Sequence, residues 1–142
     1  MTRRLACRDE EGSVTAELVI VTPLLILFLL FVVALGRLAG ARIDVDGAAA
    51  QAARAASIAY SPEAAAAAAQ ETASSSLSSQ RITCAHLQVA VDTADFVPGG
   101  TVAVTVSCAV NLSDLTGLHL PVTETLSNRF VEPIDAYRSV SG

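Results

Sequence analysis

The chain has 142 residues and a formal net charge of −5, and 52% of its residues are hydrophobic whereas 4% are aromatic. Its nine basic residues are all arginine, and they form no cluster in the acidic body of the chain. Proteins that bind nucleic acid need concentrated positive charge, so this composition excludes a nucleic-acid partner. The length leaves room for one small domain at most.

An uncharged apolar run between Glu17 and Arg37 is the strongest signal in the sequence. A run of about 18 or more apolar residues crosses roughly 30 Å of hydrocarbon as a helix, because a helix pairs its backbone polar groups internally. We therefore predict a transmembrane helix over about 18–36, with the lipid bilayer as its partner. The alternative is a secretory signal peptide cleaved near residues 39–41, but its apolar region would have only about 7–15 residues.

The position of this run also predicts an orientation in a cell membrane. Three arginines precede the run and two follow it closely, which is a weak bias towards a cytoplasmic N-terminus. A short leader before an uncleaved anchor also stays in the cytoplasm while the longer body is exported. We expect a single-pass protein with an extracytoplasmic C-terminal domain, in which Cys84 and Cys108 lie in an oxidising compartment and Cys7 in a reducing one.

Alanine-rich segments follow the apolar run and predict two helical regions. Alanine is the best helix former, so the membrane helix is expected to continue into solvent as a stalk to about residue 60. Pro62 suits the first position of a new helix and Ser61 can cap it, which predicts a short second helix over 62–79. The expected organisation is a leader over 1–12, a membrane helix and stalk over 13–60, the second helix, a sheet domain over 82–133 and a tail over 134–142.

Alternating apolar and polar residues from position 82 onward predict about three antiparallel strands. The clearest strand covers residues 101–112, a second lies around 87–91 and a third covers 122–131. The apolar faces of the first two match when Val91 lies opposite Val102, with turn residues between the strands. The predicted fold class is α+β: a long N-terminal transmembrane helix continuing as a stalk, a short alanine-rich helix and a small antiparallel sheet.

The two cysteines of the sheet region are expected to form a disulfide, which would stabilise the fold by roughly 3 kcal/mol. The register above puts Ala85 opposite Cys108, so a bond from Cys84 requires a bulge or a departure from the strand near Ala85. With His86 and His119 these cysteines form a conceivable zinc set, but the spacing matches no zinc finger. The sequence offers no catalytic constellation either, so we expect no enzymatic activity, metal or cofactor.

The bond between Gly12 and Ser13 is a candidate processing site. A peptidase at the cytoplasmic membrane face could cut after a glycine in an extended stretch, and the new amine of Ser13 could then neutralise Glu17. Neutralisation matters because a carboxylate at the bilayer edge costs up to about 3 kcal/mol. The alternative is an ordinary helix start, with Ser13 as N-cap and Glu17 in the first turn, where the helix dipole favours acids. The residues alone leave both interpretations open.

Two further features lie within the predicted membrane helix. Pro23 removes a backbone hydrogen bond and predicts a kink, which is either a hinge or a proline tolerated in the first membrane turns. Gly36 and Gly40 have the four-residue spacing that permits close packing of two helices, although such a spacing also arises by chance.

Residues 11–37 resemble the N-terminus of TadE-like proteins, the pseudopilins of tight-adherence (Flp, type IVc) pilus systems. The resemblance is carried by Gly12, by Glu17 after four intervening residues, by the early Pro23 and by the closing Gly36–Arg37 pair. It implies a type IV prepilin-like leader that a prepilin peptidase removes after Gly12. It also implies a role in cell adhesion through pilus assembly, with other pilus or pseudopilin subunits as partners.

One departure from the family pattern narrows this role. Major Flp pilins are much shorter and carry a tyrosine after the glutamate, where this chain has Leu18. The resemblance therefore implies a minor pseudopilin or pilus assembly protein. The alternative from another class is an uncleaved single-pass anchor whose extracytoplasmic domain binds a ligand, and the N-terminus of the purified chain would separate the two.

Overall fold

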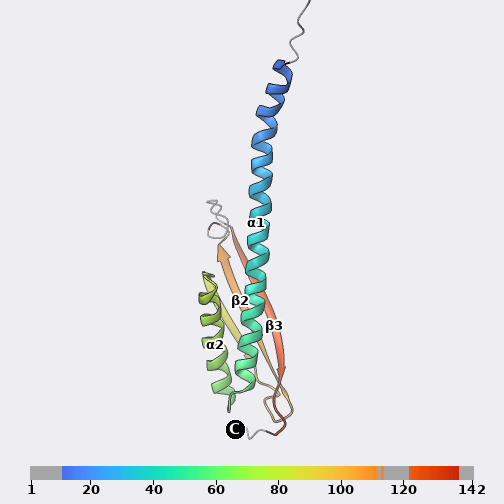
Figure 1. Cartoon of the computed structure of the whole chain (residues 1–142). Coiled ribbons are helices and arrows are strands. Elements are labelled where there is room, and N and C mark those ends of the chain that lie inside the picture. The colour runs from blue at the N-terminus through green and yellow to red at the C-terminus, as the bar shows by residue number, and fades with distance from the viewer. Residues whose placement is uncertain (1–10, 112, 114–121, 138–142) are drawn as a thin grey trace, which may run out of the picture. The chain divides into compact units, whose positions relative to one another are not determined.

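The computed structural model describes residues 11–111, 113 and 122–137 of the chain. The described elements, in chain order, are α1 (Glu11–Ser57), α2 (Pro62–Ser79), β1 (His86–Asp92), β2 (Thr101–Asn111) and β3 (Thr123–Pro133) (Figure 1). The α+β class predicted from the sequence is thus confirmed. The chain divides into two compact units, Met1–Gly36 and Arg37–Gly142, and α1 contributes residues to both.

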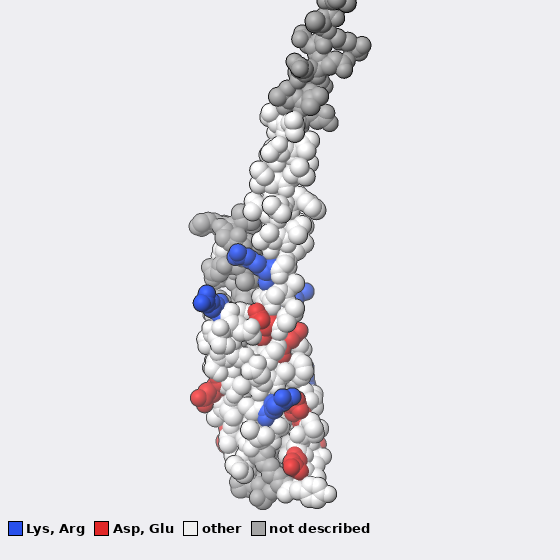
Figure 2. All heavy atoms as spheres, in the orientation of Figure 1, with Lys and Arg blue, Asp and Glu red and all other residues white. Residues whose placement is uncertain are grey.

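The described part of the first unit is the N-terminal portion of α1. Every large apolar side chain from Leu18 to Leu35 is exposed, and this segment has no charged residue (Figure 2). Among the described residues, α1 is the one helix with the length and composition to cross a membrane. A helix that is apolar all round and covered by no other element is suited to lipid rather than to water. The chain accordingly has the character of a single-pass membrane protein.

The C-terminal portion of α1 belongs to the core of the second unit, which corrects the expectation that it is a stalk in solvent. Its buried apolar positions are Ala41, Val45, Ala48, Ala49, Ala52, Ala53 and Ala56. They recur every three or four residues and therefore form one stripe along the helix. Because alanine has only a methyl side chain, the stripe lets the helix backbone lie close to the elements that cover it.

Helix α2 covers the remainder of the same core. It begins as predicted, because Pro62 occupies its first turn and the Ser61 Oγ accepts a hydrogen bond from the Ala64 amide at 3.2 Å. It buries another stripe of small residues, which consists of Ala65, Ala69, Ala73, Ser76 and Leu77. Figure 1 shows α2 beside the C-terminal portion of α1, with both helices on the same face of the sheet.

The sheet has the order β1-β2-β3 and is antiparallel throughout. The central strand β2 supplies most of the core, since Val102, Val104, Val106, Cys108 and Val110 are all buried. Strand β3 is attached to α1 by polar contacts. Asn128 Nδ2 donates to Asp46 Oδ1 at 2.6 Å, and Arg42 Nη2 lies 3.7 Å from Glu124 Oε1. The Arg42–Glu124 pair is solvent-exposed and contributes little to stability.

The predicted register of the first two strands is wrong by two residues. Val91 lies opposite Val104 rather than Val102, and Leu87 rather than Ala85 lies opposite Cys108. A shift of two residues keeps every side chain on the same face of the sheet, so the apolar pattern did not distinguish the two registers. The connection between the two strands runs from the end of β1 at Asp92 to the start of β2 at Thr101.

That connection closes one end of the core. It places Phe96 in a buried position against the sheet, together with Ile134 from the segment that follows β3. The Ile134 amide donates to the Gly100 carbonyl at 2.9 Å, and the Gly99 amide donates to the Ile134 carbonyl at 3.2 Å. The side chain of Ile134 is buried, and its amide and carbonyl groups are both hydrogen-bonded. The sheet region therefore extends to Ile134, which was predicted to belong to the tail.

Replacing Gly100 with alanine is expected to destabilise the second unit by about 1–3 kcal/mol. A methyl group at this buried position would overlap the carbonyl oxygen of Asp95, which is part of the backbone of the same turn. Thermal unfolding of the full chain in detergent, followed by circular dichroism, measures the change. Gly47→Ala is the matched control, because its added methyl group meets no atom within 4 Å and alanine favours the helix. Equal melting temperatures for the two variants would contradict the expected overlap.

Candidate functional site

The candidate processing site lies at the start of α1. Glu11 is the first described residue of α1, and the bond between Gly12 and Ser13 lies within this helix rather than in an extended stretch. Ser13 is thus inside the helix rather than at its N-cap. Glu17 follows four residues later in the same helix.

Pro23 lies inside α1, which is continuous through it. Proline has no amide hydrogen, so the carbonyl four residues earlier, that of Val19, receives no hydrogen bond from position 23. The preceding side chain bonds the neighbouring turn, because Thr22 Oγ1 donates to the Leu18 carbonyl at 2.7 Å. Together with Ile26 these residues line a shallow groove on the helix surface.

Gly36 and Gly40 have space for a side chain next to them among the described residues. A methyl group added at either position would meet no atom within 4 Å. Gly36 is exposed and Gly40 is half-buried. Both positions therefore remain accessible for the close helix packing predicted from their spacing.

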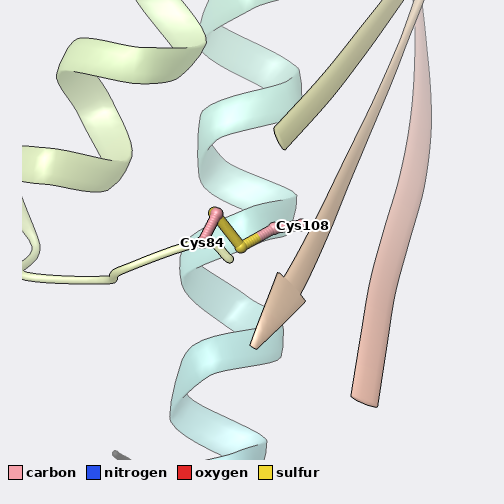
Figure 3. The surroundings of a disulfide bond; sticks show 2 residues. All are labelled: Cys84 and Cys108. Atoms are coloured by element: carbon pink, nitrogen blue, oxygen red, sulfur yellow. A yellow bond between two sulfur atoms is a disulfide. The ribbon is translucent and has the colours of Figure 1, made fainter. Parts of the chain in front are cut away.

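Cys84 and Cys108 form the predicted disulfide, with their Cα atoms 5.3 Å apart (Figure 3). Cys108 is fully buried on β2, whereas Cys84 belongs to the segment between α2 and β1. The Ala85 amide donates to the Ala109 carbonyl at 2.7 Å, so the chain joins the sheet immediately after Cys84. Cys84 therefore lies just outside the strand, which is the departure near Ala85 that the sequence predicted. The residue opposite Cys108 is Leu87 rather than Ala85.

The disulfide also bears on the conceivable zinc set. Both sulfur atoms are bonded to each other, so neither is available as a thiolate ligand. His86 is exposed at the start of β1, and His119 lies outside the described residues.

The face of the sheet turned away from the helices carries small polar side chains. Ser107 Oγ and Ser127 Oγ are 2.8 Å apart, and Arg129 Nη2 donates to Asp92 Oδ2 at 3.2 Å. The Arg129–Asp92 pair is solvent-exposed. These contacts join all three strands and were not predicted, because the residues concerned are 20 and 37 positions apart in the sequence.

The described residues define a protein of the single-pass membrane type. One helix supplies the apolar span and also part of the core of a small α+β domain, which contains a disulfide. The family described as TadE-like protein matches residues 12–54 of the chain, which confirms the resemblance seen in the sequence. The match lies entirely within α1 and supports an involvement in Tad-type pilus systems. No match to the chain is found among curated proteins or among solved structures.

Proposed function

We propose that the chain is a TadE-like minor pseudopilin or pilus assembly protein, which a prepilin peptidase processes between Gly12 and Ser13 and which acts in the biogenesis of a tight-adherence pilus. The observation that carries the proposal is the family match, which begins at Gly12, directly before the proposed cleavage point, and covers the membrane segment. The exposed apolar surface of α1 supports it, because subunits that assemble through their membrane helices need such a surface.

Processing would change the electrostatics of the helix start. Hydrolysis of the peptide bond adds water, leaves a carboxylate on Gly12 and gives Ser13 a protonated amine. Four residues later Glu17 carries the opposite charge, and a separation of four residues suits an ion pair on a helix. The amine of Ser13 would pair with Glu17 of its own chain or of a neighbouring subunit. The pair would lower the cost of keeping a carboxylate at the bilayer edge.

Assembly would use two parts of the molecule. Where α1 leaves the bilayer, Gly36 and Gly40 would permit close approach of a helix from another subunit, since an added methyl group at either position meets no atom within 4 Å. Pro23 would weaken one turn of the helix and act as a hinge when the subunit leaves the bilayer. Outside the bilayer, the exposed face of the sheet would contact other subunits.

N-terminal sequencing of the protein purified from cells with an active prepilin peptidase tests this function. A chain that begins at Ser13 is the expected result. A chain that begins at Met1 or Thr2 would contradict processing and would favour an uncleaved anchor whose outer domain binds a ligand. A chain that begins near Arg42 would contradict both and would indicate a secreted domain.

A further inference from the structure

The sheet of the second unit has β1 at one edge and β3 at the other. In the described part of the chain, each of these strands has β2 as its one neighbour, and each is antiparallel to it. The two edge strands therefore run in the same direction. An edge strand presents backbone amide and carbonyl groups that its own sheet does not use, and another strand can bond to them.

The outward-facing backbone groups of β3 belong to its odd-numbered residues. The Arg129 amide donates to the side-chain oxygen of Asn128 at 2.7 Å, whereas the Ile134 amide donates to the Gly100 carbonyl. Alternate residues of an antiparallel strand bond on opposite sides, so the even-numbered residues of β3 are those that bond β2. Thr125 and Ser127 therefore direct their amide and carbonyl groups away from the sheet.

On β1 the outward-facing backbone groups belong to Leu87, Val89 and Val91. The Ala109 carbonyl of β2 accepts a hydrogen bond on the β1 side, from the Ala85 amide at 2.7 Å. The odd-numbered residues of β2 therefore bond β1, and the residues opposite them in β1 are even-numbered. The three odd-numbered residues are left to face outward, with their side chains half-buried on the face covered by the helices.

A groove with a volume of about 270 Å³ follows the edge of β3. Its lining includes Val45 and Asp46 of α1, together with Thr125, Leu126 and Ser127 of β3. The α1 residues and the buried Leu126 lie on the helix-covered face of the sheet, whereas Thr125 and Ser127 are exposed on the other face. A groove that both sets of residues line must lie at the edge itself. It offers space for a side chain beside Leu126.

We propose that the edge of β3 binds the edge of β1 from a second copy of this chain, so that the two sheets become one. The outward-facing residues have their side chains on the exposed face in β3 and on the helix-covered face in β1. Parallel pairing of these strands therefore keeps the helices of both copies on one side, whereas antiparallel pairing would turn one sheet over. Because two different edges meet, the contact can repeat from copy to copy.

Charge complementarity favours one register of this pairing. Arg129 and Asp92 both lie on the exposed face of the sheet, Arg129 in β3 and Asp92 at the end of β1. When Asp92 of the second copy lies opposite Arg129, opposite charges meet, and all of β1 faces residues 123–129. Val89 of the second copy then lies opposite Leu126, so its side chain enters the groove and covers apolar surface. A shift of two residues in either direction removes the charge pair.

Arg129 can make this contact without losing its own. Its Nη2 donates to Asp92 of the same chain at 3.2 Å, and both side chains are more than half exposed. A guanidinium group has five N–H donors, so others remain for a carboxylate of the next copy. Arginine and aspartate side chains would thus alternate across the joined sheets.

Disulfide cross-linking between two differently tagged full chains, co-expressed and then oxidised in isolated membranes, tests the pairing. One chain carries Ser127→Cys and the other Ala90→Cys, both with Cys7→Ser, because positions 127 and 90 are opposite in the proposed register. Adjacent strands are about 4.8 Å apart, which a disulfide can span, whereas β2 separates the two positions within one chain. The mixture is expected to form a cross-linked dimer. Either chain alone should give at least about tenfold less, because like positions do not meet.

Val131→Cys is the matched control for position. It lies on the same exposed face of β3, four residues after Ser127. In the proposed register this shift places it about 13 Å along the strand from position 90 of the second copy, too far for a disulfide. Its yield with the Ala90→Cys chain should equal the background of the single chains.

Further variants separate pairing from folding. Thr125→Pro removes an amide that faces away from β2, so it should lower the cross-linking yield at least about tenfold and leave the melting temperature unchanged. Arg129→Glu in the Ser127→Cys chain, or Asp92→Arg in the Ala90→Cys chain, should each lower the yield about fivefold. The two exchanged charges together should restore it, which a loss of folding would not do.

Absence of a cross-link in the mixture would overturn the proposal. An equal yield from the Ser127→Cys chain alone would also overturn it, because β3 would then meet β3. Equal yields from positions 127 and 131, or no recovery with the exchanged charges, would contradict the register. The pairing goes beyond the proposed function and rests on the sheet alone. The intact masses of the cross-linked chains report separately whether residues 1–12 have been removed.

Discussion

Replacing Gly12 with valine is expected to leave the whole population of the protein unprocessed, with residues 1–12 still attached. Glycine has no side chain beyond its α-carbon, so a peptidase can approach the following peptide bond closely. Its backbone also changes easily from a helical to an extended conformation. Valine blocks the approach with a branched side chain that lies next to the bond to be cut. The intact mass of the protein, purified from cells with an active prepilin peptidase, reports the fraction processed. We expect a loss of at least about 100-fold in the processing rate, equivalent to about 2.7 kcal/mol.

The matched control is Gly36→Val, which places the same side chain on another glycine of the same helix. It should be processed like the unaltered chain, because Gly36 is 24 positions from the bond. If the Gly12→Val variant still gives a mature chain that begins at Ser13, the prediction is contradicted. Gly12 would then have a role in the helix but none in processing. Failure of the control as well would indicate a defect in membrane insertion rather than in cleavage.

Removing the disulfide is expected to lower the free energy of unfolding of the second unit by roughly 3 kcal/mol. The bond joins residues 24 positions apart, and without it the unfolded chain regains the freedom of that loop. Cys84→Ala with Cys108→Val is the suitable double variant, because valine fills the buried space at Cys108 without adding a polar group. Denaturant unfolding of both forms in the same detergent measures the difference.

Cys7→Ser is the control for the loss of a sulfur atom. Cys7 lies outside the described residues, and with the proposed orientation it faces the cytoplasm, so its replacement should leave the unfolding free energy unchanged. Addition of a reducing agent to the unaltered chain should reproduce the effect of the double variant. Stability of the double variant within about 0.5 kcal/mol of the unaltered chain would contradict a structural role for the bond.

The boundaries of helices and strands were predictable wherever one residue type has a strong effect on the local backbone conformation. Pro62 and Ser61 determine the start of α2, and the alternation of valines along residues 102–110 identifies β2. The register was not predictable in this way, because shifts of two residues preserve the faces of a strand. Phe96, in the connection between β1 and β2, is buried in the core that accompanies the observed register.

The role of the alanines in α1 was misjudged although a signal was present. Residues 41, 45, 48, 49, 52, 53 and 56 have helical spacing, which is typical of a buried face. Because these residues favour a helix, this part of α1 was instead predicted to be a stalk in solvent.

The use of one helix for both the span and the core has a consequence for the order in which the domain is made. With the proposed orientation, residues 37–57 leave the translocation channel first, directly behind the anchor that stays in the lipid. The alanine face of this segment, followed by α2, is therefore outside the membrane before β1, β2 and β3 emerge. Each strand can then pack against a surface that has already been exported. The C-terminal portion of α1 thus becomes available to the exported domain before the rest of that domain.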